Sequence, residues 1–454
     1  MKEKEREARQ LKNWTLGILT VTLFIVALIS YTLVTRKLTC FQATLVFLTY
    51  YGMLTMAFCL FLRHYEPLRN DFYRPFVSII VPAKNEEQVI EATVRSLAGL
   101  NYRKGNRPHF EIIVVDDSSR DGTSLILERL RNEFPMLMPL RRDGGAPGKS
   151  AVLNFGLSHS KGEVIAIFDA DSRVEPDFLK KTVPYLFEPH VAGVQGRVRI
   201  TNASENILTL LQEDEFATYA HMFQISKDIF GGVMILAGNG QVTKRSALED
   251  AGGWNEKSAT DDMDLTMKFL LEGKMVRYCR DAVVWQEGIS HPRPFLRQRI
   301  RWAEGMLKCL YDYMFPVFAS KKISFIKKCD SLIGLFRIVA PLLVWMCYLE
   351  TALVYLCGWI FTTTLPDPLI NSLPWVFAIV MGGGMLKFVD RPNLSMLIRV
   401  PIYWGYNFFW MLAVPVGFLN CIKNMHTVQW DKTEHRGAAV ASAVSAPPSA
   451  AAGE

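Results

Sequence analysis

The sequence predicts an α/β domain with a mostly parallel sheet, inserted between transmembrane α-helices. Two observations support this fold class. From Pro75 onward, short β-branched runs alternate with helical patterns, which is typical of parallel sheets. Apolar stretches, uncharged except for Glu350, lie on both sides of this polar region, and each is near or above the roughly 18–20 apolar residues that cross a bilayer.

The apolar stretches predict about five membrane segments, two before the polar region and three after it. They comprise residues 13–35, 38–62, 338–366, 368–386 and 400–422. Basic residues in the N-terminal arm and around residues 321–328 indicate that these parts, and with them the central domain, face the cytoplasm. Three later crossings would place Lys423 outside, a conflict that an interfacial or re-entrant stretch, or an irregular last turn, would remove.

The chain is thereby divided into six predicted regions. They are an N-terminal arm (1–12), two transmembrane helices (13–63), a cytoplasmic α/β domain (74–290), amphipathic interface helices (291–330), about three transmembrane helices (331–422) and a partly disordered tail (423–454).

The net charge of +7 is explained by basic cytoplasmic loops. Acids are interspersed through the central region, so nucleic-acid binding is not expected. The eight cysteines form no C-x-x-C pair, so neither zinc nor a disulfide framework is indicated.

Three strands of the predicted sheet end in polar residues. The strands are Phe76–Ala83, Glu111–Asp117 and Glu163–Asp171, with helical patterns after the first two. Their polar ends are Asn85-Glu86, Asp116-Asp117, and Asp169 with Asp171. Because ligands bind outside the carboxyl ends of parallel strands, these residues are expected to line one site.

The loop "RDGGAPGKS" ends in the three letters that close a P-loop. A P-loop also needs a glycine five residues before its second glycine, and Asp143 stands there, where its carboxylate would face the bound anion. A polar surface turn before a helix remains the other interpretation. The loop alone does not decide between them.

Two acidic motifs indicate chemistry. Asp169 and Asp171, one residue apart, can hold one hard divalent cation that also bridges to ligand phosphates. In "TDDMD", Thr260 is a plausible N-cap followed by acids in a first helical turn, which the helix dipole favours. Alternatively, one of these acids is a general base. Residues 297–314 are typical of an amphipathic helix at a membrane surface.

With these residues in place, the chain resembles the family-2 inverting glycosyltransferases of the GT-A fold, in their membrane-integrated branch. The branch includes cellulose, hyaluronan and poly-N-acetylglucosamine synthases, ceramide glucosyltransferases and cyanobacterial monoglucosyldiacylglycerol synthases. The resemblance covers about Pro75 to Met314. It rests on "VPAKNE", "VVDDSSRDGT", "GKSAVLNFG", "FDADS", and the pair "TDDMD" with "QRIRW", in that order.

The resemblance implies a role for each matched residue. Asp262 would be the catalytic base, and Asp169 and Asp171 would bind Mg²⁺ or Mn²⁺. The UDP-sugar donor would contact Pro82, Ala83, Asn85, Glu86, Asp116, Asp117, Lys149 and Asp169. The diphosphate and acceptor would contact Asp261, Gln298, Arg301, Trp302 and the loop residues Gly238, Asn239 and Gly240. Lys149 would thus serve a sugar nucleotide, without a Walker loop.

The implied activity is transfer of Glc or GlcNAc from a UDP-sugar to an acceptor hydroxyl, giving a β-glycoside. The preferred acceptor is a growing polysaccharide, because the membrane plan resembles polymer synthases. Glu350 and Asn407 would then line a channel, and the alternative for Glu350 is a pairing within the helix bundle. The alternative is a diacylglycerol β-glucosyltransferase, which "GNGQ", "GGWNE", "TDD" and "RWAEG" resemble most. A transporter or receptor with a nucleotide-sensing domain would need no base, and a P-loop ATPase is a third class. The expected location is the cell membrane. Membrane lipids are expected partners, and an accessory membrane protein is a further candidate.

Overall fold

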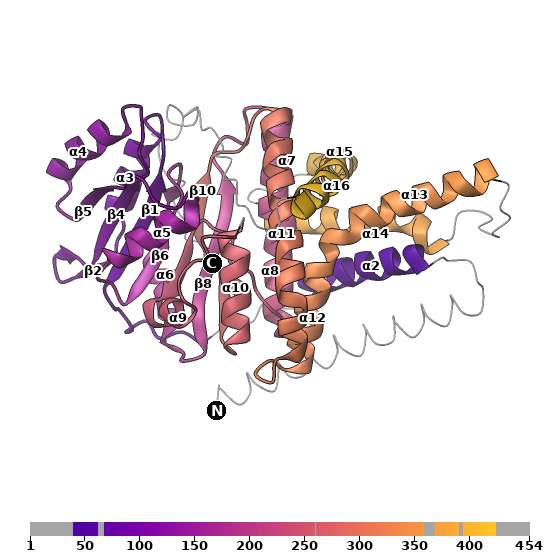
Figure 1. Ribbon diagram of the computed structural model, residues 1–454, viewed down its shortest axis with the longest axis horizontal. Helices are drawn as coiled ribbons and strands as arrows, with labels where there is room; N and C mark the ends of the chain where they lie inside the picture. The colour runs from indigo at the N-terminus through magenta and orange to yellow at the C-terminus, as the bar shows by residue number, and fades with distance from the viewer. Residues whose placement is uncertain (1–39, 62–67, 259, 358–367, 390–393, 424–454) are drawn as a thin grey trace.

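The computed structural model describes residues 40–61, 68–258, 260–357, 368–389 and 394–423. Within these ranges an α/β domain stands beside a group of apolar helices (Figure 1). The long helix α11 (Pro292–Ala319) runs along the boundary between the two parts. The predicted arm (1–12), the predicted segment 13–35 and the tail after residue 423 lie outside the described residues.

The α/β domain is built on one eight-stranded sheet in the order β5-β4-β1-β6-β9-β8-β10-β7. Pairing is parallel from β5 to β6 and between β8 and β10, whereas β9 and β7 run antiparallel to their neighbours. The strands are β1 (Val77–Ala83), β4 (Phe110–Asp116), β5 (Leu137–Arg141), β6 (Val164–Ile167), β7 (Arg173–Val174), β8 (Val191–Ile200), β9 (Gln241–Lys244) and β10 (Met275–Gln286). A separate hairpin pairs β2 (Arg103–Lys104) with β3 (Arg107–Pro108).

Helices cover the sheet, and its central strands are buried on both faces. Ile79 of β1 packs in one apolar cluster and its neighbour Ile80 in the other, which is why the parallel strands are continuous apolar runs. The helical elements of this part are α3 (Ile90–Ala98), α4 (Thr123–Glu133), α5 (Lys149–Ser158), α6 (Phe178–Thr182), η1 (Val183–Phe187), α7 (Ile207–Asp214), the π-helix η2 (Glu215–Ala220), α8 (His221–Phe230), α9 (Arg245–Asp250) and α10 (Asp261–Leu271).

Strand register brings the predicted polar ends to one edge of the sheet. Ala83 at the end of β1 pairs with Asp116 of β4, and Ile80 pairs with Ile167 at the end of β6. The predicted strand Glu163–Asp171 is shorter than expected, because the chain turns at Asp169, whose carbonyl accepts a hydrogen bond from the Ser172 N–H. Asp169 and Asp171 therefore lie on the loop that follows β6.

Most of the apolar helices lie on the far side of α11 from the sheet, whereas α12 lies alongside α11 at the boundary (Figure 1). They are α2 (Cys40–Phe61), α12 (Phe325–Phe336), η3 (Arg337–Val339), α13 (Ala340–Cys357), α14 (Pro368–Phe388), η4 (Leu394–Ile398), α15 (Arg399–Tyr406) and α16 (Phe408–Lys423). Within the described residues, three helical runs are long and apolar enough to cross a membrane: Gln42–Phe61, Phe325–Leu349 and Met396–Lys423. The second begins before the expected Ile338, because α12, η3 and α13 follow one another without a break.

Candidate active site

Asp117 lies at the end of the β1–β4 pair and is held between two cations. Its Oδ1 accepts hydrogen bonds from Arg142 Nη2 at 2.6 Å and Nε at 2.9 Å, and its Oδ2 accepts one from Lys84 Nζ at 2.9 Å. The Asp117 and Arg142 side chains are both buried. Because each charge has a partner, the carboxylate is fixed in one orientation at the edge of the predicted nucleotide site.

The loops that follow β1 and β4 are held together by hydrogen bonds from backbone N–H groups. Asn85 has a left-handed φ of 52°, and its side-chain oxygen accepts a hydrogen bond from the Arg120 N–H at 2.8 Å. The Glu86 N–H donates to the Thr123 hydroxyl at 2.8 Å. Asp116 accepts hydrogen bonds from the Ser119 N–H at 2.9 Å and from the Ser124 hydroxyl. Pro82 and Ala83 are buried within β1, where Ala83 contributes its carbonyl to the Asp117 N–H.

Lys149 is the first residue of α5 and projects to the middle of the acidic cluster. Its ammonium donates to Asp169 Oδ1 at 2.6 Å and to the Gly238 carbonyl at 3.3 Å, and it lies 4.0 Å from Asp261 Oδ2. Burial disfavours the charged form, but attraction by Asp169 and Asp261 outweighs it, so the pKa of Lys149 lies above its usual value. The lysine therefore stays charged among carboxylates.

Asn239 ties the loop after β6 to the loop before β9. Its side-chain oxygen accepts hydrogen bonds from the Ser172 hydroxyl at 2.9 Å and from the Asp169 N–H at 3.3 Å. On the far side of this loop, Asp171 Oδ2 accepts a hydrogen bond from the Glu287 N–H at 2.8 Å. The two acids of the D-x-D motif are thus positioned by different segments of the chain.

Gly238 and Gly240 flank Asn239 with left-handed φ angles of 71° and 69°. A Cβ placed on Gly238 would lie 3.3 Å from Asp262 Oδ2 and 3.5 Å from Lys149 Nζ. A Cβ on Gly240 would lie 2.5 Å from Val284 Cγ1. Both glycines are therefore required by close approach and by backbone conformation.

Asp262, in the first turn of α10, faces this glycine loop. Its Oδ1 accepts a hydrogen bond from the Met263 N–H at 2.7 Å. Burial and the charge of Asp261 raise the pKa of Asp262 to about 7, although the Met263 N–H and Lys149 act in the opposite direction. Asp261 Oδ2 is buried without a hydrogen-bond partner in the described part of the chain. A carboxyl with a pKa near 7 can take up a proton at neutral pH.

Helix α11 carries Gln298, Arg301 and Trp302 and packs against the start of α10. Gln298, Arg301, Trp302 and Gly305 follow an i, i+3, i+4, i+7 spacing, so they share one helix face. A Cβ on Gly305 would collide with the Thr260 side chain, which shows how closely the two helices approach. The motif is therefore turned toward the helix that carries Asp262.

Thr260 is the N-cap residue of α10 by position, but its side chain makes no capping hydrogen bond. Its hydroxyl instead lies 3.5 Å from Cys309 Sγ on α11. The prediction of the capping position is met, whereas the expected capping interaction is replaced by packing between the two helices.

The Asp169 and Asp171 carboxylates have donor chemistry that suits a metal ion. Carboxylate oxygens favour hard divalent cations such as Mg²⁺, which use one or two carboxylates together with ligand phosphates and water. Among the described residues, no group of three or more His, Cys, Asp or Glu side chains could hold a metal ion. The two residues therefore fit a cation that shares its coordination sphere with a bound diphosphate.

Comparison with known proteins identifies the domain. The model of the family "Glycosyl transferase family 2" matches residues 78–252. Residues 78–252 form a family-2 glycosyltransferase domain. A β-monoglucosyldiacylglycerol synthase from Synechocystis sp. is 41% identical over 240 residues, which is 53% of this chain and 49% of that protein. A glucomannan 4-β-mannosyltransferase from Arabidopsis thaliana is 31% identical over 288 residues, covering 60% of this chain and 51% of that protein.

The glycosyltransferase domain has the expected GT-A fold. A solved mannosyltransferase from Pyrobaculum calidifontis, in complex with GDP-Man and Mn²⁺, superposes with a TM-score of 0.56 at 19% identity. The superposition covers 84% of this chain and 99% of that one. The chain itself spans about half the length of the curated relatives it matches.

The predicted site residues fall into two groups and a third set on α11. Lys149, Asp169, Gly238, Asp261 and Asp262 come together around one ammonium. Asp116, Asp117, Asn85 and Glu86 gather at the β1–β4 edge. Gln298, Arg301 and Trp302 are joined to the first group through the contact of α11 with α10.

Three further residues were not anticipated from the sequence. Lys84 and Arg142 both donate hydrogen bonds to Asp117. Each stands near acidic residues in its own loop, and this local pattern could have indicated an ion pair. Arg299 is buried, donates to Glu215 Oε2 at 2.6 Å and lies with its guanidinium 4.2 Å from the Trp302 ring centroid. No local pattern joins Arg299 to Glu215, because 84 residues separate them.

Proposed function

We propose that the protein is a membrane-associated inverting glycosyltransferase that moves a hexosyl unit from a UDP-sugar to the hydroxyl of a lipid acceptor. The observation that carries this proposal is the convergence of Asp169, Lys149 and Asp262 beside the Gly238 loop of a family-2 domain. An acid that can accept a proton then lies next to the groups that would bind a sugar diphosphate.

In this proposal, Asp262 takes the proton of the acceptor hydroxyl. The acceptor oxygen forms a bond to the anomeric carbon as the bond from that carbon to the diphosphate oxygen breaks, and UDP leaves with the bonding electrons. One displacement inverts the anomeric centre, so an α-linked donor gives a β-glycoside. Positioned proton transfer of this kind typically contributes ~10²–10⁴-fold.

Charge on the departing diphosphate is balanced by cations of the site. Lys149 is already held in the acidic cluster, and Arg301 shares the helix face that is turned toward α10. Asp169 and Asp171 would hold Mg²⁺ or Mn²⁺, which supplies further neutralisation of the diphosphate. Preorganised charge of this kind usually contributes more to the rate than any other single effect.

A lipid acceptor is favoured by the relatives and by the helices of this chain. The relative from Synechocystis sp., at 41% identity, is named for the synthesis of a glucosyldiacylglycerol. Asn407, which a polymer channel was expected to use, donates its amide to the Tyr403 carbonyl in the preceding turn, at 2.8 Å. The Asn407 side chain thus has a hydrogen-bond partner within its own helical segment.

Polysaccharide synthesis is the second candidate. It is favoured by the Q-x-x-R-W motif on α11 and by the similarity to a glucomannan mannosyltransferase. We infer the same placement for both candidates, with the glycosyltransferase domain on the cytoplasmic face and the apolar helices in the cell membrane, as basic residues at Lys321 and Lys327 favour.

Release of UDP by the full-length protein in detergent tests the proposal. UDP-sugars are screened with diacylglycerol present or absent, with Mg²⁺, Mn²⁺ or a chelator, and radiolabelled product is partitioned between organic and aqueous phases. We expect a chelator-sensitive, organic-extractable product bearing one sugar. A water-soluble polymer would support the second candidate, and turnover by Asp262→Asn at the wild-type rate would contradict both.

A further inference from the structure

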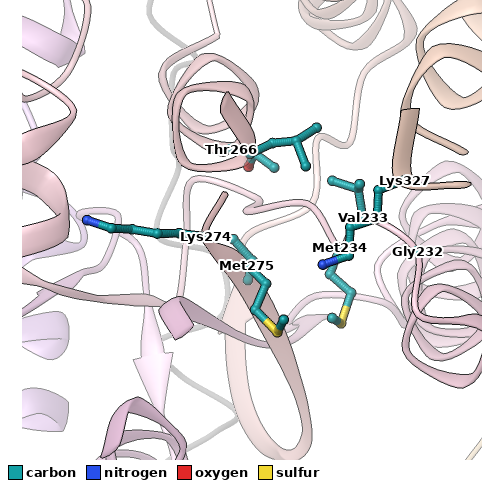
Figure 2. Close-up of a pocket in the computed structure, with 9 residues that line it drawn as sticks. Gly232, Val233, Met234, Thr266, Lys274, Met275 and Lys327 are labelled. Atoms are coloured by element: carbon teal, nitrogen blue, oxygen red, sulfur yellow. The ribbon is translucent and has the colours of Figure 1, made fainter. Parts of the chain in front are cut away.

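A pocket opens behind the helix that carries Asp262. About 250 Å³ of space between atoms, open solvent included, lies between α10, α12 and the segments before β9 and at the start of β10. Its walls are mostly apolar, with contributions from Val233, Met234, Leu270, Met275 and Val276. Thr266 and Lys327 are the polar groups that α10 and α12 contribute (Figure 2). None of the pocket residues belongs to the predicted sugar-nucleotide site.

Lys327 is a half-buried cation that points into this pocket. Figure 2 shows its ammonium beside Met234, whereas the Lys274 side chain extends away from the pocket toward Asp250, its ion-pair partner at 2.5 Å. Within the described residues, Lys327 has neither a hydrogen bond nor an ion pair, and the nearby charge that acts on it is the like charge of Arg277. A cation in such surroundings is unfavourable until an anion joins it.

Three neighbouring lysines have partners, in contrast to Lys327. Lys322 pairs with Glu272 at 2.8 Å, Lys328 donates to the Phe318 carbonyl at 2.8 Å, and Lys227 pairs with Asp330. An anion in the pocket would therefore meet an ammonium that is not already neutralised, together with apolar walls.

The position of the pocket indicates where its anion comes from. Lys327 lies in the first turn of the apolar run Phe325–Leu349, which is long enough to cross a membrane. Phe318 and Phe325, close to it along the chain, are 68% and 77% exposed. Aromatic and basic side chains at the start of a membrane helix are typical of the headgroup level of a bilayer.

We propose that this pocket binds the phosphate group of an anionic membrane lipid, with Lys327 as its charge partner. The pocket is connected to the catalytic elements through Thr266, whose hydroxyl donates to the Asp262 carbonyl at 2.8 Å and accepts from the Leu236 N–H at 3.0 Å. Leu236 lies just before the glycine loop that faces Asp262. Lipid binding beside Thr266 would increase transfer, a second effect that rests on the proposed function.

The test uses the full-length protein in phosphatidylcholine discs that contain diacylglycerol, with the screened UDP-sugars in solution and increasing fractions of phosphatidylglycerol. Thermal unfolding and UDP release are measured for the wild type, Lys327→Met and Lys327→Arg. Lys321→Met is the matched control, because it removes the same charge from an exposed position shortly before α12. We expect phosphatidylglycerol to raise the wild-type Tm, and Lys327→Met to start from a higher Tm because an unpaired cation has been removed.

For Lys327→Met, half-saturation should need about ten- to a hundredfold more phosphatidylglycerol, the loss expected for one charge-assisted hydrogen bond. Lys327→Arg should restore the response. An unchanged response in Lys327→Met, or an equal loss in Lys321→Met, would overturn the proposal. Saturation by inorganic phosphate at constant ionic strength, without phosphatidylglycerol, would overturn the lipid assignment. A Tm response without UDP release would support the pocket and refute the proposed function.

Discussion

The Lys149 ammonium donates a 2.6 Å hydrogen bond to Asp169 Oδ1 and so joins the start of α5 to the loop after β6. The same ammonium lies 4.0 Å from Asp261 Oδ2 and is close to the carboxylate of Asp262. One positive charge therefore links the D-x-D motif to the acidic turn of α10. This relationship leads to the first two predictions.

Replacement of Lys149 by methionine should lower kcat for UDP release by about 10²–10³-fold, the loss typical of one preorganised electrostatic contact. It should also move the acidic limb of the pH–rate profile to higher pH, because Lys149 lowers the pKa of Asp262. Lys161→Met, at an exposed position, serves as the control. A profile that keeps its wild-type midpoint would show that Lys149 does not act on the base.

Replacement of Asp261 by asparagine should have the opposite effect on the profile. As the proposed base, Asp262 would act only when deprotonated, so wild-type activity should rise as the pH passes through about 7. Without the repulsion from Asp261, the pKa of Asp262 falls and the rise should occur at lower pH. The pH dependence of kcat/KM checks this, and a shift to higher pH would be inconsistent with the assigned base.

Replacement of Asp262 by asparagine should remove activity without loss of stability at alkaline pH. The folded-state pKa of about 7 lies above the unfolded value of about 3.9. The stability contributed by the bound proton is therefore complete below about pH 4 and is lost as the pH rises through about 7. In thermal unfolding, the Tm of Asp262→Asn minus the Tm of the wild type should be larger at pH 8 than at pH 5. An equal difference at both values would argue against a raised pKa.

The buried pair of Arg299 and Glu215 should be strongly coupled. Arg299 also contacts the Tyr406 hydroxyl at 3.0 Å, so the pair connects α11 to α15. Arg299→Met or Glu215→Gln alone leaves a buried group without its partner, which typically costs about 3–5 kcal/mol. The double variant should cost clearly less than the sum. Denaturant unfolding in detergent measures the cycle, and additive costs would mean that the pair is not coupled.

The elements that could be predicted from the sequence are those with local patterns. The strand Val77–Ala83 is a continuous apolar run. Asp169 follows a strand and Asp262 lies in the first turn of a helix, so a short stretch of sequence around each acid is enough to indicate its position. Parallel register then places the strand ends together without further information. The comparisons confirm the family-2 domain that these ordered motifs indicated.

The parts that could not be predicted depend on contacts between distant segments. The apolar pattern begins a membrane segment at residue 338, but α12, which carries charged residues, starts the same helical run at Phe325. The partner of the Thr260 hydroxyl could not be predicted, because this hydroxyl contacts Cys309 of α11 instead of capping α10. The partners of Asp117 and Arg299 follow from tertiary packing, which no window of sequence contains.

The contact of Gly305 with Thr260 has a consequence for where the reaction takes place. With only a hydrogen atom at position 305, the surface helix rests directly on the turn that bears the acid. In the proposed reaction, the short separation between α11 and the acid Asp262 therefore depends on the absence of a Cβ at position 305. Under the proposed function, a lipid acceptor lying against α11 would meet Asp262 across this single helix contact.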